Sequence, residues 1–411
     1  MHTEIIAIGS ELLTPYRQDT NSLWLTEKLL SLGIPVIRKT VVGDSRVDIR
    51  SAFEEALERA ELVIGIGGLG PTQDDITREV VADLLQRPLE ENAEILARIE
   101  ERFRARGRRM PEVNKRQALV PRGAVALDND NGTAPGLWLE ETNKVVLLLP
   151  GPPQELMPMF EQHCLGPLRE RAPRNILQTR VFKVVGMPES EVEEKIAPLY
   201  SRYSNPATTI LASPGEVQIH LQASGERRER VEHLLNELGD QMEALLGDNI
   251  FSRGPETLEQ VVGMYLLMRG ATLAVAESCT GGLIARRLTD VPGSSRYFLG
   301  GVICYSNAVK EKLAGAPPKL LKQKGPVSEE VTAALARGIR RHARARLGLA
   351  VTCIAGPEGG LPLKPVGTTF IALADDHREH VVKYRFLGDR ERVRWQASQA
   401  ALDFVRRRLM K

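Results

Sequence analysis

Short apolar runs alternate with amphipathic stretches over the first 168 residues of the chain. Four runs, at residues 4–8, 34–42, 62–66 and 145–149, have the length of strands, and residues 47–60 carry a helical pattern between two of them. Continuous apolar strands separated by helices are typical of a parallel sheet covered on both faces. Residues 1–168 are therefore predicted to form a three-layer α/β domain that binds ligands at the carboxyl ends of its strands.

The pattern changes in residues 174–252. Residues 216–222 alternate between apolar and polar, as a half-exposed strand does, and helices are predicted at 190–200 and 227–246. This segment is predicted to be a small α+β domain. It carries no recognisable chemistry, so we interpret it as a spacer.

Residues 256–411 return to the alternation seen at the start of the chain. Apolar runs predict strands at 272–276, 298–305, 349–354, 368–374 and 380–386, with a long helix at 328–347 and another from residue 390. The carboxyl-terminal segment is therefore predicted to be a second α/β domain, and the whole chain is assigned to the α/β class.

Composition narrows the class of protein. The 411 residues include 55 Lys and Arg and 53 Asp and Glu, a net charge of +2 that argues against binding nucleic acid. No apolar run approaches membrane-spanning length and the chain begins directly in a predicted strand, so no membrane association and a cytoplasmic location are expected. The four cysteines have no zinc-like spacing, and neither a structural metal nor a disulfide framework is expected.

Candidate chemistry in the last domain begins where an apolar strand runs into a helix at residues 278–282, Ser-Cys-Thr-Gly-Gly. Small side chains and backbone N–H groups at a helix N-terminus favour a phosphate. Because the histidines lie away from this segment, a Ser-His pair is not expected. A buried lysine can instead act as the base for a serine. Lys310 is the candidate base, Tyr305 lies five residues before it, and Ser294 or Ser295 precedes both.

The first domain has a glycine-rich segment at residues 65–77 that follows a strand and opens a helix. Its glycines can bring backbone N–H groups against phosphate oxygens. Asp74 and Asp75 either bind a divalent cation or cap the helix. Polar residues at 9–13 and 19–21, and shorter segments at 43–44 and 151–153, also follow strands or open helices.

Taken together with the clusters at 292–295, 305–310, 355–357 and 364–367, these motifs resemble the CinA family over the whole chain. Residues 256–411 resemble its nicotinamide mononucleotide (NMN) deamidase module, which implies hydrolysis of NMN to nicotinic acid mononucleotide and ammonia without a cofactor. By motif position, the resemblance implies Ser295 as nucleophile, Lys310 as base and Tyr305 as a partner that orients or shares the proton. It implies substrate contacts from Ser278, Thr280, Gly281, Gly282, Thr352, Gly356, Arg390 and Arg394.

Residues 1–168 resemble the molybdopterin-binding fold as CinA proteins carry it. In that family the module is associated with metal-dependent hydrolysis of ADP-ribose to AMP and ribose 5-phosphate. The resemblance implies a divalent cation, with Asp44, Asp74 and Asp75 as ligands or water-activating groups. The implied substrate-binding residues are Ser10, Glu11, Asn21, Gly67, Gly68, Gly70, Thr72, Gly151 and Pro152.

Two positions depart from the family pattern. Cys353 stands where the family commonly has glycine, which alters the pocket if the backbone there requires a positive φ and is tolerated otherwise. Pro15 stands where glycine is frequent and is expected to stiffen its loop.

The sequence favours a bifunctional hydrolase of NAD salvage that takes NMN and ADP-ribose as small-molecule substrates. Three alternatives remain: an amino-terminal domain that binds a molybdopterin or nucleotide without catalysis, a competence- or damage-response adaptor, and a deamidase whose nucleophile is Cys279 at a helix N-terminus. The choice between Ser278 and Ser295 stays open. A homodimer is expected, because composite sites are common in small α/β modules.

Overall fold

The computed structural model describes residues 1–172 and 176–411, so the predicted boundary at residue 174 lies outside the described residues. The chain divides into two compact units. One comprises Met1–Gln178 with Ser224–Val231, and the other comprises Thr179–Ala223 with Glu232–Lys411. Within the described ranges, no helix has the length and apolar character needed to span a membrane.

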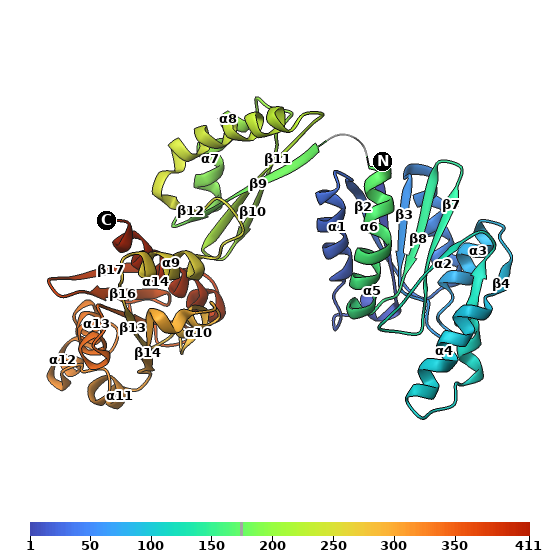
Figure 1. The fold of residues 1–411 in the computed structure, drawn as a ribbon. Helices are drawn as coiled ribbons and strands as arrows, with labels where there is room; N and C mark the ends of the chain where they lie inside the picture. The colour runs from blue at the N-terminus through green and yellow to red at the C-terminus, as the bar shows by residue number, and fades with distance from the viewer. Residues whose placement is uncertain (173–175) are drawn as a thin grey trace. The chain divides into compact units, whose positions relative to one another are not determined.

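The amino-terminal domain is built on a six-stranded sheet with the order β2-β1-β3-β8-β7-β6 (Figure 1). The four parallel strands are β1 (Thr3–Ile8), β2 (Val36–Val42), β3 (Leu62–Ile66) and β8 (Lys144–Leu149). Two strands that the sequence pattern did not predict, β7 (Gly136–Glu141) and β6 (Val125–Leu127), extend the sheet in the antiparallel direction.

Helices cover both faces of this sheet, which confirms the α/β class. One buried apolar cluster lies beneath α2 (Arg46–Arg59), α3 (Thr77–Leu84) and α4 (Ala93–Ala105). The opposite cluster lies beneath α1 (Asn21–Ser31), α5 (Pro153–Met159) and α6 (Leu165–Arg171). The remaining elements are η1 (Ser10–Leu13), β4 (Leu89–Glu91), η2 (Glu112–Ala118), β5 (Leu119–Pro121) and η3 (Phe160–Cys164).

The middle segment forms a four-stranded sheet with the order β10-β11-β9-β12. Its elements are β9 (Ile176–Val185), α7 (Glu189–Tyr200), β10 (Ala207–Ser213), β11 (Glu216–Gly225), α8 (Arg228–Leu246), η4 (Gly247–Asn249) and β12 (Ile250–Ser252). Alternate side chains of β11 are buried, as the period of two in the sequence predicted.

The carboxyl-terminal domain has a five-stranded sheet with the order β14-β13-β15-β16-β17. Strands β13 (Leu273–Glu277), β14 (Phe298–Ile303) and β15 (Leu347–Cys353) are parallel, and β16 (Thr368–Ala374) and β17 (Glu379–Arg385) are antiparallel. The carboxyl ends of the central strands β13 and β15 therefore lie side by side at one edge of the sheet.

Two layers of helices enclose this second sheet. Helices α9 (Leu258–Met268), α10 (Leu283–Thr289) and α14 (Arg390–Met410) pack over one apolar cluster. Helices α11 (Asn307–Lys312), α12 (Pro318–Lys324) and α13 (Glu329–Ala343) cover the other face, whose core consists largely of alanines. The short η5 (Ser294–Arg296) precedes β14.

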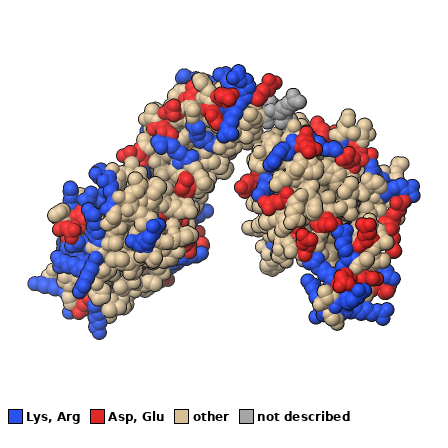
Figure 2. Space-filling view, viewed as in Figure 1, with Lys and Arg blue, Asp and Glu red and all other residues tan. Residues whose placement is uncertain are grey.

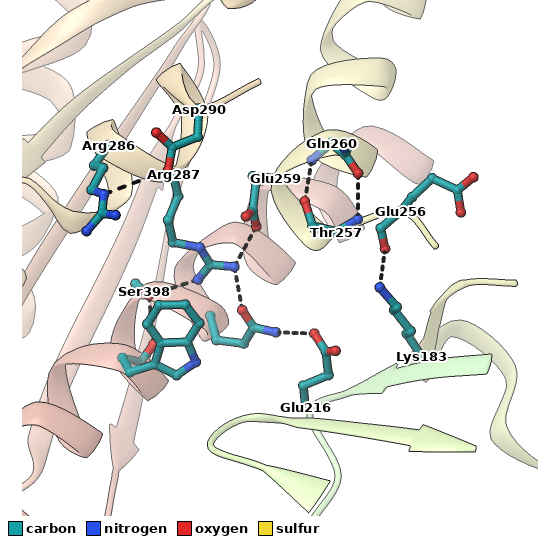
Figure 3. Close-up of polar contacts among 12 residues, drawn as sticks. Lys183, Glu216, Glu256, Thr257, Glu259, Gln260, Arg286, Arg287, Asp290 and Ser398 are labelled. Carbon is teal, nitrogen blue, oxygen red and sulfur yellow. Dashed lines mark hydrogen bonds and ion pairs between the residues drawn. The ribbon is translucent and has the colours of Figure 1, made fainter. Parts of the chain in front are cut away.

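A buried arginine connects the middle sheet to the carboxyl-terminal domain (Figure 3). Arg287 of α10 donates to Ser398 Oγ at 2.9 Å, Glu259 Oε2 at 2.7 Å and Gln399 Oε1 at 2.6 Å. The amide nitrogen of Gln399 then donates to Glu216 Oε2 of β11 at 3.2 Å. The middle domain, interpreted from sequence as a spacer, is thus hydrogen-bonded to α14 and is linked through Gln399 to α10.

Replacing Arg287 with alanine should lower the free energy of unfolding of this unit by roughly 3 kcal/mol, because the buried Gln399 and the partly buried Glu259 lose their partner. The matched control is Arg286→Ala on the same helix, since the exposed side chain of Arg286 pairs with the exposed Asp290 at 3.8 Å. That pair is worth less than about 0.5 kcal/mol. Denaturation followed by hydrogen exchange in α10 and β11 measures the stability of both variants. Equal losses of stability in the two variants would contradict the structural role assigned to Arg287.

Candidate active site

The loop after β13 is fixed by a buried carboxylate. Glu277 Oε2 accepts hydrogen bonds from the backbone N–H groups of Gly282 at 3.0 Å and Ile284 at 3.1 Å, and Oε1 accepts from Ala285 at 2.8 Å. A carboxylate at a helix N-terminus satisfies the free amides and complements the helix dipole. Of the amides predicted to seat a substrate phosphate at residues 278–282, that of Gly282 is therefore already used by a side chain of the protein.

Lys310 lies in the first turns of α11 and is 2% exposed. Its Nζ lies 3.1 Å from Ser278 Oγ, and it donates to the carbonyl oxygens of Cys304 at 2.8 Å and Tyr305 at 2.9 Å. Among the described residues it forms no ion pair with a carboxylate. Burial lowers the pKa of Lys310, because the charged ammonium loses its hydration without gaining a counterion.

Nζ thus has three hydrogen-bond partners, the two carbonyl oxygens and the hydroxyl of Ser278. In the neutral amine the two N–H groups can serve the carbonyl oxygens, which leaves the lone pair for the hydroxyl of Ser278. The geometry therefore has the form of a nucleophile and its base within hydrogen-bonding reach.

The structure separates the two serines that the sequence left open. Ser278 directly follows β13, is 7% exposed and lies against Lys310. Ser295 is exposed on η5, and no hydrogen bond joins it to Lys310 in the described part of the chain. The lysine is thus brought to Ser278 rather than to Ser295, whose implied role as nucleophile has no geometric support.

Tyr305 and Arg390 form one exposed side of this site. Arg390 donates from Nη2 to the Tyr305 hydroxyl at 3.1 Å and from Nη1 to the carbonyl of Gly356 at 2.8 Å. The Tyr305 side chain is 61% exposed, and the backbone carbonyl of the residue, not its phenol, contacts Lys310. The implied proton-sharing role of the phenol is therefore not supported by a contact.

Other implied substrate residues have structural partners. Arg394 donates to the carbonyls of Cys279 at 3.0 Å and Thr280 at 2.9 Å, so it holds the loop. The buried Thr352 shares a hydrogen bond with Thr332 at 2.7 Å. The hydroxyl of Thr280 is buried without a hydrogen-bond partner, and it remains the polar group of the loop that a ligand could satisfy.

The cysteines differ from the expectation. Cys279 and Cys353 form a disulfide, although the sequence predicted none. Cys279 is then no thiolate, which contradicts its proposed role as nucleophile in this form of the chain. Cys353 lies in β15 without a positive φ, so cysteine is tolerated there. Burial raises the pKa of Cys164 to about 12 and of Cys304 to about 11, as expected for inert buried thiols.

The amino-terminal motifs gather at the carboxyl ends of their strands. The backbone N–H of Ser10 donates to Asp44 Oδ2 at 2.8 Å, and that of Asp44 donates to Ser10 Oγ at 3.2 Å. Glu11 is exposed on η1. Asn21 donates to the carbonyl of Gly151 at 2.7 Å, and its side-chain oxygen is buried without a partner. Loops after β1, β2 and β8 are thus connected around one edge of the sheet.

The glycine-rich loop is held by its own side chains. Thr72 donates from its backbone N–H to Asp75 Oδ2 at 2.9 Å. A Cβ at Gly68 would lie 2.0 Å from Thr77 Oγ1, and one at Gly70 would lie 2.4 Å from Asp75 Oδ2. The hydrogen bond to Thr72 lowers the pKa of the exposed Asp74. These glycines are therefore required for packing of the loop as well as for approach of a ligand.

The predicted metal ligands do not form a protein cage. In the described ranges, no three His, Cys, Asp or Glu side chains come together as a metal site. Asp44 and Asp75 each use a carboxylate oxygen within the loops. The residues alone do not fit a resident cation, and a divalent ion at this edge would depend on oxygens supplied by the substrate.

One loop was missed from the sequence. Residues 128–136 lie beside the segment that follows β8, where Asn129 donates to Glu155 Oε2 at 2.7 Å and Asn131 donates to the carbonyl of Gln154 at 2.8 Å. A Cβ at Gly132 would lie 1.9 Å from Glu155 Oε2. The polar run before the Ala-Pro-Gly of this segment could have marked the loop in the sequence. The sequence could not show that this loop lies beside the segment at Pro152.

Family comparisons agree with this architecture. Residues 4–170 match the probable molybdopterin binding domain, residues 179–252 the damage-inducible protein CinA KH domain, and residues 255–409 the CinA C-terminal domain. A CinA-like protein of Koribacter versatilis (strain Ellin345) is 48% identical over 414 residues, which cover 100% of both chains.

Two further proteins illustrate the range of relatives. A putative competence-damage inducible protein of Caldicellulosiruptor saccharolyticus is 40% identical over 410 residues, and the alignment covers 100% of both chains. The crystal structure of CinA from Thermoplasma acidophilum aligns at 33% identity with a TM-score of 0.37, covering 39% of this chain and 94% of that one. With relatives of this identity aligned over their full length, the chain belongs to the CinA family.

Proposed function

We propose that the carboxyl-terminal domain is an amidohydrolase that converts NMN to nicotinic acid mononucleotide and ammonia. The observation that carries this proposal is the buried Lys310 Nζ at 3.1 Å from Ser278 Oγ. A serine beside a lysine of lowered pKa is an activated nucleophile for acyl transfer. The resemblance of the surrounding motifs to the NMN deamidase module supplies the substrate.

In the proposed reaction, neutral Lys310 accepts the proton of Ser278 as Oγ attacks the carboxamide carbon. The tetrahedral intermediate collapses when the leaving nitrogen takes that proton from Lys310, and ammonia departs from an ester on Ser278. Water then attacks the ester with Lys310 again as base, which releases the acid and restores the hydroxyl. NMN and water are thus converted to nicotinic acid mononucleotide and ammonia.

A cation beside the site would favour binding of the substrate phosphate, because Glu277 already accepts from three amides at the start of α10. Arg390 is exposed beside the site and retains donors beyond its bonds to Tyr305 and Gly356. Lys and Arg outnumber Asp and Glu in residues 256–411, and Figure 2 shows blue side chains gathered over this domain. This charge favours an anionic substrate over a neutral amide.

For the amino-terminal domain we propose hydrolysis of the diphosphate of ADP-ribose. A divalent cation would be held between oxygens of the protein and oxygens of the diphosphate. The supporting observation is the ring of strand-end loops that contains the buried, unpaired side-chain oxygen of Asn21. Asp44 and Asp74 are the carboxylates that we expect to contact such a cation. ADP-ribose and NMN are both fragments of NAD, so one chain would return both to use.

Binding of a molybdopterin or nucleotide without catalysis is the second candidate for this domain, since the same loops would hold such a ligand. The names of the relatives also suggest a response to competence or damage. Turnover of ADP-ribose by the purified chain separates catalysis from binding.

Serine replacement tests the assignment of the nucleophile. Ser278→Ala and Lys310→Met should each lower kcat for ammonia release from NMN by about 10³-fold or more, because nucleophile and base act as a unit. Ser295→Ala is the matched control and should stay within about threefold of the unmodified protein. An active Ser278→Ala beside an inactive Ser295→Ala would assign the chemistry to the other serine.

The pH dependence of kcat/KM tests the state of Lys310. Activity requires the neutral amine, so it should rise with pH and level off above the lowered pKa of Lys310. Because burial lowers this pKa, the midpoint of the rise should lie below the value of about 10.4 for an ordinary lysine. Lys310→Arg should be inactive throughout, since a guanidinium stays charged. A midpoint at or above the ordinary value would contradict a lowered pKa.

The amino-terminal activity can be removed separately. A Cβ at Gly67 would lie 2.3 Å from the carbonyl oxygen of Ile8, at a φ of +100°. Gly67→Ala should therefore distort the loop and abolish hydrolysis of ADP-ribose while NMN deamidation continues. Gly166→Ala, where a Cβ meets no atom within 4 Å, is the control. Product analysis with a phosphate-ester assay measures both, and full ADP-ribose hydrolysis by Gly67→Ala would place the site elsewhere.

A further inference from the structure

The disulfide joins two positions that immediately follow residues of the proposed site. Cys279 follows Ser278, and Cys353 ends the adjacent parallel strand β15. Their Cα atoms lie 5.6 Å apart across 74 residues of sequence, and the two side chains are 5% and 8% exposed. The bond therefore crosses the strand ends within one residue of the nucleophile.

A hydrogen bond already connects the same two segments. The backbone N–H of Ser278 donates to the carbonyl of Val351 at 3.1 Å, two residues before Cys353. On its other side, the loop is held by Arg394, which donates to the carbonyls of Cys279 and Thr280. The disulfide thus adds a covalent connection to a loop that hydrogen bonds also hold.

Breaking this bond requires the two sulfur atoms to separate. Bonded sulfurs lie about 2.0 Å apart, whereas non-bonded heavy atoms rest at about 3.5–4.0 Å. The surrounding core is close-packed, because both cysteines belong to the buried cluster beneath α9, α10 and α14. The separation therefore requires a new rotamer of Cys279 or Cys353 or a shift of the backbone of β15 or of the loop, and a shift of the loop would displace Ser278 from Lys310.

We propose that Cys353 is a positioning residue for the nucleophile, and that the Cys279–Cys353 pair is a site of reversible thiol–disulfide exchange that controls the deamidase. This inference rests on the proposed function. In the disulfide form, Ser278 Oγ lies 3.1 Å from Lys310 Nζ, and in the proposal the dithiol form is the less active one.

The exchange uses a low-molecular-weight disulfide such as oxidised glutathione. A thiolate of the pair attacks the small disulfide, releases one small thiol and forms a mixed disulfide, and the second cysteine displaces the other small thiol. One S–S bond breaks in the small molecule and one forms in the protein, so the pair is oxidised while the small disulfide is reduced to two thiols. The reverse reaction returns the dithiol.

The test equilibrates the full-length protein in glutathione buffers of different thiol-to-disulfide ratio. Alkylation and peptide mass spectrometry report the state of Cys279 and Cys353, and ammonia release from NMN reports kcat and KM. We expect the pair to titrate as one transition and kcat to fall about tenfold or more on reduction, with KM changed less than about threefold, because a displacement of about 1 Å can cost as much as 10²-fold in rate.

Two variants serve as controls. Cys353→Ala removes one of the crowded thiols and should make kcat independent of the buffer. Cys164→Ala removes a buried free thiol of the other domain and should leave the titration unchanged. Free thiols at both positions in the oxidised buffer, or equal kcat for the disulfide and dithiol forms, would overturn the proposal.

A second readout separates this inference from the deamidase proposal. A sulfonyl fluoride should modify Ser278 several-fold faster in the disulfide form than in the dithiol form, because the reaction depends on the serine and its base and not on NMN. If neither form releases ammonia, the proposed function fails, and the rate of sulfonylation still decides the positioning role. Equal rates of modification in the two forms would refute that role.

Discussion

The site depends on a lysine that is buried without a counterion. An ammonium removed from water normally pairs with a carboxylate, and Glu277 lies on the strand that leads directly to Ser278. Both oxygens of Glu277 are used by the amides of α10, so Lys310 is left with two carbonyl oxygens and the hydroxyl of Ser278. Capping of one helix by Glu277 therefore leaves Lys310 without a counterion, and burial lowers its pKa toward the neutral amine on which the proposed chemistry depends.

The sequence predicted the architecture well where burial is complete. Strands β1, β3, β8 and β15 are buried along almost their whole length, and their continuous apolar runs identified them. The antiparallel β6 and β7 were not predicted, because their positions depend on pairing with β8 and not on a distinct local pattern. The periodicity and length of the apolar runs thus identified the layers of each domain, but they did not show how many strands the first sheet contains.

Only part of the site could be predicted from the sequence, because residues that are far apart along the chain meet in it. Lys310 could be identified from its motif, whereas the choice between Ser278 and Ser295 depends on which loop reaches α11 in space. An anion seat was predicted from small residues, and the sequence did not reveal that Glu277 would accept hydrogen bonds from Gly282, Ile284 and Ala285. The disulfide depends on β13 lying beside β15, which the spacing of Cys279 and Cys353 does not show.

The middle domain has a structural role, which comes from the hydrogen bonds around Arg287. Glu216 reaches Gln399 and, through it, Arg287 on α10, the helix whose N-terminus Glu277 caps (Figure 3). The middle domain is therefore hydrogen-bonded to α14 and, through Gln399, to the helix that follows Ser278. This contact and the Cys279–Cys353 bond restrain the Ser278 loop from two sides, one through α10 and one through β15.

The most direct test of the central claim is to stop the protein with acid during turnover of NMN and to map the covalent product by peptide mass spectrometry. The account predicts a nicotinic acid mononucleotide ester on Ser278, with the mass of NMN less ammonia. The same ester on Ser295 or on a cysteine would contradict the assignment of Ser278 and Lys310 as nucleophile and base.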